Sequence, residues 1–270
     1  MQILGIESST KYLSVSLSRA EDQISSMLLK SSRGFMSNII SVIDKVLKKG
    51  HCELSGVDFF AVNTGPGDFT GTRIGLSVAK ILALVEKKPV FAVSCPDVFA
   101  ASILENNKAG IMLSLLKGGS ALAVPVIDVK RDELYFSVYE ATFSDYGQPA
   151  SVCRVKIKDS SIYMRKVTAD FLADYESFSQ KLEEVLLSGS LILSGPAQTA
   201  IYCGGTAFDS YGHLATDIKK LGYNFIVSRK TIFPHAAYIN KCAAFRAGRG
   251  QTGGDKNIAP LYVREFVPFK

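Results

Sequence analysis

Histidine is scarce in this chain, which has only three in 270 residues. His51, His213 and His235 lie far apart, and none stands three or four residues from another. Only such a spacing lets one helix face present two imidazoles to a metal ion. The sequence therefore predicts no metal site, and it excludes a metalloprotease built on paired histidines.

Cysteine is also sparse: five residues, an odd number, with no Cys-x-x-Cys pair. This pattern excludes a zinc knuckle and a disulfide framework, and it favours a reducing compartment. We expect Cys95 and Cys203 to be small buried residues. No apolar run reaches the roughly 18 residues that a membrane helix needs, and no basic segment precedes an apolar run at the N-terminus. A cytoplasmic protein with no membrane segment is expected.

Neither sign of charge dominates, because the chain has 31 basic and 25 acidic residues and a net charge of +6. The basic doublets are scattered along the chain, so no dedicated RNA-binding stripe is visible, although a weak attraction to RNA is compatible with the charge. A chain of this length with 47% hydrophobic residues can bury one large core or two modest ones.

The most informative segment present is residues 63–75, which read NTGPGDFTGTRIG. An apolar strand pattern over 57–62 precedes it, and apolar residues recur at helical spacing after it: Ile74, Val78, Ile81, Leu82 and Val85. Gly65 and Gly67 permit backbone conformations closed to other residues, while Pro66 stiffens the turn. The segment predicts a strand-to-helix corner, and helix N-termini attract anions.

Known phosphate loops do not match this corner. Thr72 and Arg73 follow Gly71, where a P-loop would have Lys and then Ser or Thr, and the glycine spacing differs from the dinucleotide fingerprint. The chain also contains neither a Gly-x-Ser-x-Gly elbow nor a recognisable Cys and His pairing. Walker-type chemistry is excluded, and both an anion site and a purely structural corner remain open.

Residues 65–75 resemble the GPGSFTGxRxG signature of the TsaB (YeaZ) family, which acts in forming threonylcarbamoyladenosine in tRNA. Three further segments, 1–9, 127–135 and 259–264, resemble that family's opening strand, central hairpin and closing P-x-Y-x-R element. Asp68 stands where the family usually has Ser, and Glu7 where it usually has Asp. The signature loop of this chain comprises Gly65, Pro66, Gly67, Asp68, Phe69, Thr70, Gly71, Arg73 and Gly75.

The chain opens with three short strands, and the second, 12–18, alternates apolar residues with serines, which we expect to face outward. A helix at 35–49 ends at Gly50. The remaining predicted elements are strands at 89–93, 123–129, 134–142, 151–157 and 191–193, helices at 97–105, 168–187 and 236–247, and a flexible tether at 248–255.

The order hairpin, strand, helix, strand occurs twice, which resembles the actin-like ATPase (ASKHA) architecture to which the TsaB family belongs. The implied fold class is α/β, with two actin-like (ribonuclease H-like) lobes, each a mixed sheet flanked by helices. The composition shifts to Asn, Lys, Gly and Ser at 106–120, so the first lobe is predicted to comprise 1–105 plus 236–270, and the second 106–235.

Two turns stand where actin-like ATPases contact nucleotide. One is Glu7, Ser8, Ser9 and Thr10; the other contains Gly204 and Gly205. Glu7 and Asp128 would then face each other across a cleft and hold magnesium through water, with weak binding of ATP or ADP. The alternative is that these residues only form turns, since Ser, Thr and Gly are common turn residues.

The resemblance implies a non-catalytic subunit that binds and activates a TsaD-type threonylcarbamoyltransferase acting on adenosine 37 of tRNA. A TsaE-like ATPase would join the complex, tRNA would be contacted indirectly, and the chain would form a homodimer when alone. No cofactor of its own is predicted. The alternative function is an ATP-dependent kinase of the same superfamily acting on a small substrate.

We expect the partner to dock on two apolar helices, as a four-helix bundle formed with the same helices of a homologue. The predicted contacts are Met36, Ile39, Ile40 and Ile43 on the first helix, with Leu76, Lys80 and Leu84 on the second. The alternative is that these residues pack on their own sheet. Arg73 begins a helix, where a cation is unfavourable, so it is expected to pair with Asp68 or Glu7.

Overall fold

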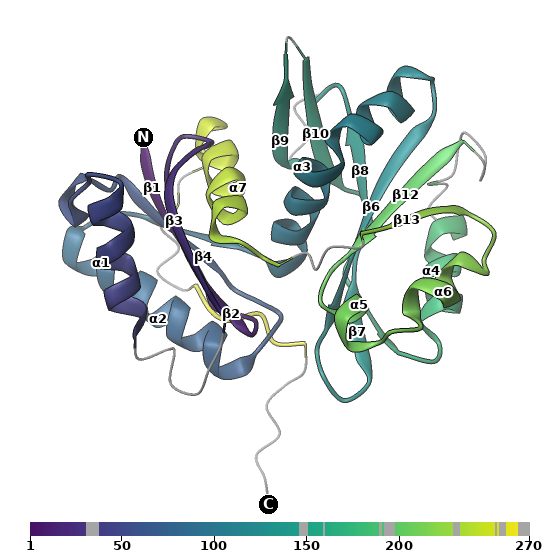
Figure 1. Ribbon diagram of the computed structural model, residues 1–270, viewed down its shortest axis with the longest axis horizontal. Coiled ribbons are helices and arrows are strands. Elements are labelled where there is room, and N and C mark those ends of the chain that lie inside the picture. Colours follow the sequence, from purple (N-terminus) through teal and green to yellow (C-terminus); the bar gives the residue numbers. More distant parts are fainter. Residues whose placement is uncertain are drawn as a thin grey trace, which may run out of the picture. The chain divides into compact units, whose positions relative to one another are not determined.

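The computed structural model describes residues 1–30, 38–145, 151–158, 160–188, 191, 198–228, 233–251, 253 and 258–263. The chain forms two compact units, Met1–Cys95 with His235–Lys270, and Pro96–Pro234 (Figure 1). Each unit is a mixed β-sheet flanked by helices, which confirms the predicted fold class.

The first division between the units falls at Pro96 rather than at residue 106. A single helix, α3 (Cys95–Leu116), runs through the segment whose composition suggested a linker. Its asparagines are compatible with a helix, because the Asn106 and Asn107 side chains donate to the carbonyls of Ser102 and Ile103, at 2.9 Å each. The expected helix at 97–105 is therefore only part of a longer one.

Unit 1 contains a five-stranded sheet in the order β3-β2-β1-β4-β5. The three opening strands are antiparallel, as predicted, and β4 and β5 run parallel to β1. Their bounds are β1 (Gln2–Glu7), β2 (Tyr12–Arg19), β3 (Asp22–Lys30), β4 (Phe59–Asn63) and β5 (Val90–Val93).

Helices cover both faces of this sheet. One face packs against α1 (Ile39–Lys49) and α2 (Phe69–Glu86), which share a core cluster with β1, β2 and β4. The other face packs against α7 (Ala236–Gly248), so the predicted return of this helix to the first lobe is confirmed.

The expectation that the β2 serines face solvent is wrong, because α7 covers them. Ser14, Ser16 and Ser18 are all buried. Ser14 Oγ accepts a hydrogen bond from the amide of Ala236 at 3.1 Å, and Asn240 Nδ2 donates to Ser18 Oγ at 2.9 Å. Polar side chains tolerate burial when they are hydrogen-bonded in this way.

Unit 2 contains an eight-stranded sheet around the long strand β6 (Ser120–Asp128). On one side, β6 pairs antiparallel with β7 (Glu133–Phe136) and β8 (Tyr139–Thr142), confirming the predicted hairpin. On the other side it pairs parallel with β12 (Thr199–Gly204), which pairs with β13 (Asn224–Val227). The sheet continues from β8 through β10 (Ser160–Lys166) to β9 (Ser151–Ile157), and from β7 to β11 (Phe171–Asp174).

The predicted helix at 168–187 is wrong in its first half, where β11 forms. Phe171 packs on Phe136 with ring centroids 5.3 Å apart, which fixes this segment to β7. The Asp174 carboxylate accepts from the amide of Ser177 at 2.9 Å, and α4 (Phe178–Ser188) begins directly afterwards. Of the predicted strand at 191–193, residue 191 is a turn and the rest lies outside the described residues.

Helices also cover both faces of the second sheet. One face packs against α4, α5 (Ala207–Ser210) and α6 (Leu214–Lys219). The opposite face carries Tyr139, whose hydroxyl donates to the Asp97 carboxylate in α3 at 2.8 Å. Within the part of the chain that the structure describes, no helix combines the length and the apolar character needed to cross a membrane.

Candidate functional site

The turn at 7–10 and the loop at 63–75 meet at one end of the unit 1 sheet, and we call this arrangement the signature corner. Ser8 Oγ donates to the carbonyl of Gly71 at 2.8 Å, and the amide of Asp68 donates to the carbonyl of Ser9 at 2.6 Å. A Cβ atom on Gly67 would lie 2.2 Å from the Ser9 carbonyl oxygen. The glycine is therefore needed because the two segments approach so closely.

Gly65 fastens the loop to two strands. Its φ of +93° lies in the region that favours glycine, and a cis peptide bond joins it to Pro66. Its amide donates to Asn63 Oδ1 at 2.8 Å, while its carbonyl accepts from the amide of Cys95 at 2.7 Å. The loop is thus tied to the ends of β4 and β5.

Asp68 caps the N-terminus of α2. Its Oδ1 atom accepts from the amide of Gly71 at 2.7 Å, and its carbonyl accepts from the amide of Thr72 at 2.9 Å. Ser is also a good N-cap, so the departure from the family signature keeps the cap and adds a negative charge that the helix dipole favours. A carboxylate therefore stands where a phosphate would bind, and this favours the structural interpretation of the corner.

Glu7 is fully buried beneath the corner. Its Oε1 atom accepts from the amide and the hydroxyl of Ser9, at 2.7 and 2.6 Å, and its Oε2 atom accepts from Asn63 Nδ2. Burial raises the pKa of Glu7 to about 7, and the hydrogen bonds from Ser9 and Asn63 offset only part of that effect. The carboxyl group therefore titrates near neutral pH.

Arg73 does not pair with Asp68 or Glu7, so that prediction is wrong. Its Nε atom donates to the Tyr262 hydroxyl at 2.6 Å, and its guanidinium lies 3.8 Å from the centroid of the Phe69 ring. Tyr262 was not among the residues predicted to be functional, although the tyrosine of the closing element was the available signal. Among the described residues, Arg73 thus interacts with aromatic side chains rather than with the predicted carboxylates, and aromatic rings attract such a cation.

Asp128 ends β6 in unit 2 and forms a second corner there. Its amide donates to Thr206 Oγ1 at 2.9 Å, and its carboxylate accepts from Ser210 Oγ at 2.7 Å and from Lys130 Nζ at 3.0 Å. Burial by itself would raise the pKa of Asp128, but the hydrogen bonds from Ser210 and Lys130 and the charge of Lys130 lower it overall. Thr206 directly follows the glycines of the predicted turn, whereas the sequence contained no signal for Ser210.

Gly204 and Gly205 lie where the backbone of this second corner is tightly packed. Gly204 is buried at the end of β12, and a Cβ atom on Gly205 would lie 2.1 Å from the Val126 carbonyl oxygen. Glu7 and Asp128 belong to different units, so the magnesium site between them stays a prediction. Among the described residues, no group of three or more His, Cys, Asp or Glu side chains is placed to hold a metal ion.

Sequence comparison gives relatives that are named for threonylcarbamoyladenosine formation in tRNA. The family model described as TsaD, tRNA N6-adenosine threonylcarbamoyltransferase, matches residues 29–161. The chain is 30% identical to the tRNA threonylcarbamoyladenosine biosynthesis protein TsaB of Haemophilus influenzae, over 55% of this chain and 58% of that protein. It is 30% identical to the tRNA N6-adenosine threonylcarbamoyltransferase of Persephonella marina, over 44% of this chain and 40% of that protein.

The structural comparison covers more of the chain. YeaZ from Pseudomonas aeruginosa matches 97% of this chain and 99% of its own, with a TM-score of 0.66 and 20% sequence identity. The chain is therefore similar in sequence to proteins of the TsaB (YeaZ) family and shares the fold of YeaZ. By sequence it spans less than two thirds of the curated relatives it matches.

The TsaB-type partner face predicted from the sequence is only partly exposed. Ile39, Ile43 and Leu76 have 3%, 3% and 4% of their surface exposed and belong to the core of unit 1, so they are wrong as partner contacts. Ile40 and Leu84 are 56% and 79% exposed. Lys80 is half-buried, and Met36 lies outside the described residues.

Helix α2 has an unusual distribution of side chains. The residues that face the sheet are mostly small: Gly71, Thr72, Gly75, Leu76, Ala79 and Ala83. Large apolar side chains point outward instead, since Ile81 and Val85 are 59% and 66% exposed. A Cβ atom on Gly75 would lie 2.1 Å from Ser8 Oγ, so the helix needs small residues to approach the sheet.

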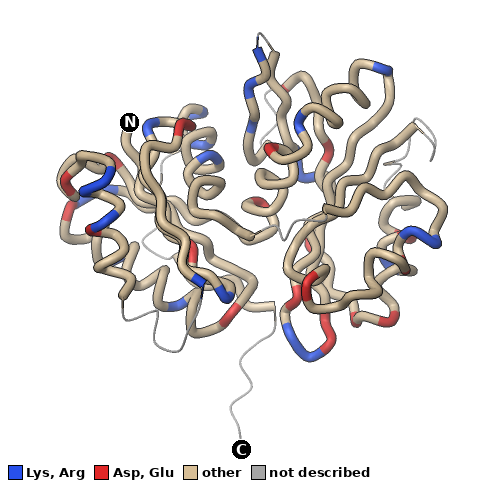
Figure 2. The backbone as a smooth tube through the Cα atoms, in the orientation of Figure 1, with Lys and Arg blue, Asp and Glu red and all other residues tan. Residues whose placement is uncertain are grey.

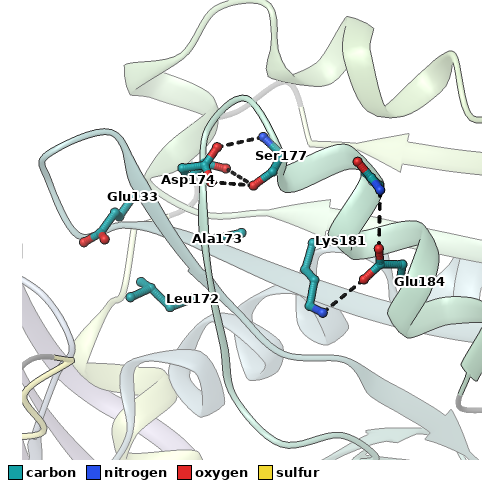
Figure 3. Close-up of a pocket in the computed structure, with 8 residues that line it drawn as sticks. Glu133, Leu172, Ala173, Asp174, Ser177, Lys181 and Glu184 are labelled. Carbon is teal, nitrogen blue, oxygen red and sulfur yellow. Dashed lines mark hydrogen bonds and ion pairs between the residues drawn. The ribbon is translucent and has the colours of Figure 1, made fainter.

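A pocket of about 420 Å³ lies between β11 and α4 in unit 2 (Figure 3). Its polar side chains bind one another: Ser177 Oγ donates to Asp174 at 2.6 Å, and Lys181 Nζ donates to Glu184 at 3.0 Å. None of the residues predicted from the sequence as functional is among its lining residues. The lining comprises Glu133, Leu172, Ala173, Asp174, Ser177, Gln180, Lys181 and Glu184.

Proposed function

We propose that this chain is a non-catalytic subunit in the formation of threonylcarbamoyladenosine at position 37 of tRNA, where it binds and activates a TsaD-type threonylcarbamoyltransferase. The names of its relatives in Haemophilus influenzae and Persephonella marina support this role. The observation that carries the proposal is the outward apolar surface of α2.

The docking surface consists of Ile40, Ile81, Leu84 and Val85, and we call it the α1/α2 face. All four side chains are more than half exposed. Burying one such side chain contributes about 1.5–3 kcal/mol, so leaving four exposed forgoes substantial stabilisation unless a partner covers them. Ile81 lies three and four residues before Leu84 and Val85 on α2, so these three side chains share one helix face. Exposed apolar surface of this kind marks interaction sites. A TsaD-like protein would cover it in the complex, and a second copy of this chain would cover it otherwise.

The closed signature corner supports a binding role rather than chemistry. The amides of Gly65, Asp68 and Gly71 donate to acceptors of the chain itself, and the Asp68 carboxylate occupies the start of α2. Activation of the partner would then come from binding one of its conformations more tightly than the other. A TsaE-like ATPase and tRNA complete the proposed complex.

Co-purification with a TsaD-like protein, followed by tRNA modification with and without this chain, tests the proposal. Leu84→Glu is expected to abolish both association and activation, because it introduces a charge into the docking surface. Leu187→Glu is the matched control, since Leu187 is 62% exposed but lies on α4 of unit 2. Full activation by Leu84→Glu would contradict the proposed surface.

ATP turnover by the isolated chain tests the alternative function, a kinase. We expect no hydrolysis near about 1 per second, a rate typical of enzymes. Turnover that is lost in both Glu7→Gln and Asp128→Asn would show that the two carboxylates perform chemistry. Modification that needs the partner and survives both substitutions would support the non-catalytic role.

A further inference from the structure

Strands β8, β10 and β9 form an extension of the unit 2 sheet with two different faces. Residues directly opposite in antiparallel strands share a face, and successive residues alternate between faces. One face is apolar and buried, and comprises Ala141, Cys153, Val155, Ile162 and Met164. The other face carries side chains that are half-buried or exposed, and we call these residues the ribbon face: Glu140, Thr142, Arg154, Lys156, Tyr163 and Arg165.

Tyr163 lies at the centre of the ribbon face. The strand register sets it opposite Arg154 on β9 and opposite Thr142 on β8. Lys156, two residues beyond Arg154, is exposed, as is Lys158 just after the strand. Lys and Arg positions follow this hairpin in Figure 2. The ribbon face therefore combines an aromatic ring with several positive charges.

Among the strand residues that the structure describes, one acid lies on the ribbon face beside three basic residues, so these residues together carry a positive charge. Glu140 on β8 forms an ion pair with the Arg165 guanidinium, which the register sets directly opposite it. No acid is set opposite Lys156, whose cross-strand neighbour is Ser161.

Protection of an edge strand explains only part of this arrangement. Lysines on an edge strand discourage pairing with other chains, and β9 is an edge of the sheet. Tyr163 and Arg165 lie on β10, however, which pairs with β8 on one side and β9 on the other. A tyrosine ring between basic side chains on a sheet is the combination that binds bases and phosphates of RNA.

We propose that the ribbon face binds tRNA, with the basic side chains contacting phosphates and Tyr163 stacking on an unpaired base. This inference rests on the proposed function, which brings tRNA to the complex. Counting basic doublets missed the surface, because Arg154, Lys156 and Lys158 are separated by single residues. Strand alternation places Arg154 and Lys156 on one face, and Lys158 follows in the turn after β9.

Binding of an unmodified tRNA transcript to the full chain, measured over a range of salt concentrations, tests this surface. Lys156→Glu with Lys158→Glu is expected to weaken binding about tenfold or more and to lower the salt slope by about 1 for each phosphate that is no longer neutralised. Lys117→Glu with Lys219→Glu makes the same change in net charge at two exposed positions elsewhere in unit 2. This control is expected to retain most of the affinity.

Substitution of Tyr163 separates RNA recognition from general attraction to polyanions. Tyr163→Leu is expected to weaken binding of tRNA but not of heparin, whereas Tyr163→Phe keeps the ring and the affinity. Absence of tRNA binding at low salt, equal losses in the two lysine pairs, or a Tyr163→Leu variant that binds tRNA normally would overturn the proposal.

Association with a TsaD-like protein distinguishes this proposal from the proposed function. The ribbon-face variants are expected to co-purify with the partner as the unaltered chain does, because the α1/α2 face is unchanged. If they also bind tRNA normally, only the RNA surface is refuted. If tRNA binding depends on the ribbon face but no TsaD-like partner associates, only the proposed function is refuted.

Discussion

The two units follow one strand plan but end their central strands with different electrostatics. In each unit the central strand, β1 or β6, has antiparallel pairing on one side, and on the other side it pairs with a parallel strand that pairs in turn with a second one. Each ends in a carboxylate, but Glu7 is buried with a pKa of about 7, while Asp128 contacts Lys130 and has a lowered pKa. The strand topology determines the position of each acid, and the groups around the acid determine its pKa.

The helices that follow the two corners differ as well. In unit 1 the corner opens into α2, an 18-residue helix that Asp68 caps, whereas in unit 2 it opens into the four-residue α5. Only a long helix can offer a continuous apolar stripe to a partner, since one turn spans about 3.6 residues. Of the two helices that follow the corners, only α2 is long enough for such a stripe, which agrees with docking on unit 1 under the proposed function.

The largest expected effect concerns the two faces of α1. Ile40→Glu should leave the fold intact, because Ile40 is 56% exposed, but lower partner association at least about 30-fold, the scale of an interface hot spot. Ile39→Glu should unfold unit 1, since Ile39 is only 3% exposed. Thermal melts and co-purification of both variants check this. Similar unfolding of both would assign Ile40 to the core and contradict the α1/α2 face.

Glu7 and Asp128 should affect the pH dependence of the free energy of unfolding in different ways. Because the pKa of Glu7 is raised from its ordinary 4.5 to about 7 in the folded state, the folded chain holds its proton more tightly. The free energy of unfolding should then fall as pH rises from about 4.5 to about 7, by up to about 3 kcal/mol, and level off above that range. Urea unfolding at pH 5 and pH 8 measures the difference.

Substituting each acid separately tests this difference. Glu7→Gln should remove the decrease in the free energy of unfolding between pH 5 and pH 8. The lowered pKa of Asp128 has the opposite sign: its contribution is present above the ordinary value of 3.8 and is lost as pH falls below it. Asp128→Asn should therefore leave the slope between pH 5 and pH 8 unchanged. A slope that persists in Glu7→Gln would show that another group causes it.

Removing the cation of the signature corner should have a moderate effect. Arg73→Ala is expected to lower stability or partner affinity by about 1 kcal/mol, because the exposed guanidinium loses a hydrogen bond to Tyr262 and its stacking on Phe69. Tyr262→Phe removes the hydroxyl but keeps the ring, so it should cost less. Full stability of Arg73→Ala together with loss of an ATPase activity would favour a kinase.

Local patterns in the sequence predicted the strands and α-helices of unit 1 but not which of their faces are covered. The alternation in β2 correctly predicts a strand, yet the helix that buries its serines comes more than 200 residues later, and alternation does not encode such a contact. In β11 the alternation extends over four residues, too few to distinguish a strand from the start of a helix.

At the candidate site, too, the sequence predicted the local structure but not which side chains are buried. Glycine spacing predicts the signature corner, because close approach requires glycine whatever the tertiary context. The partner face was misassigned in part, because apolar residues occur on both sides of α1 and α2. Hydrophobicity predicts an inward face of large residues, whereas α2 turns its small ones to the sheet. Only the three-dimensional structure distinguishes Leu76 from Leu84.

The smallest expected effect compares the turns that follow the two central strands. In unit 2 this turn holds Lys130, Arg131 and Asp132 at φ values of 70°, 58° and 59°, which is costly for residues with a Cβ atom. Arg131→Gly should stabilise the chain by about 0.5 kcal/mol, since relief of about 1–2 kcal/mol exceeds the added backbone entropy of the unfolded chain.

The corresponding turn of unit 1 supplies the control for this substitution. Lys11 joins β1 to β2 and has no left-handed φ, so Lys11→Gly adds entropy to the unfolded chain without relieving strain. It should therefore lower the midpoint of urea unfolding, whereas Arg131→Gly should raise it. Equal shifts of the same sign would mean that the left-handed turn stores no strain. Opposite shifts would show that unit 2 keeps its turn in a costly conformation, which the contacts of Asp128 with Lys130 and Ser210 offset.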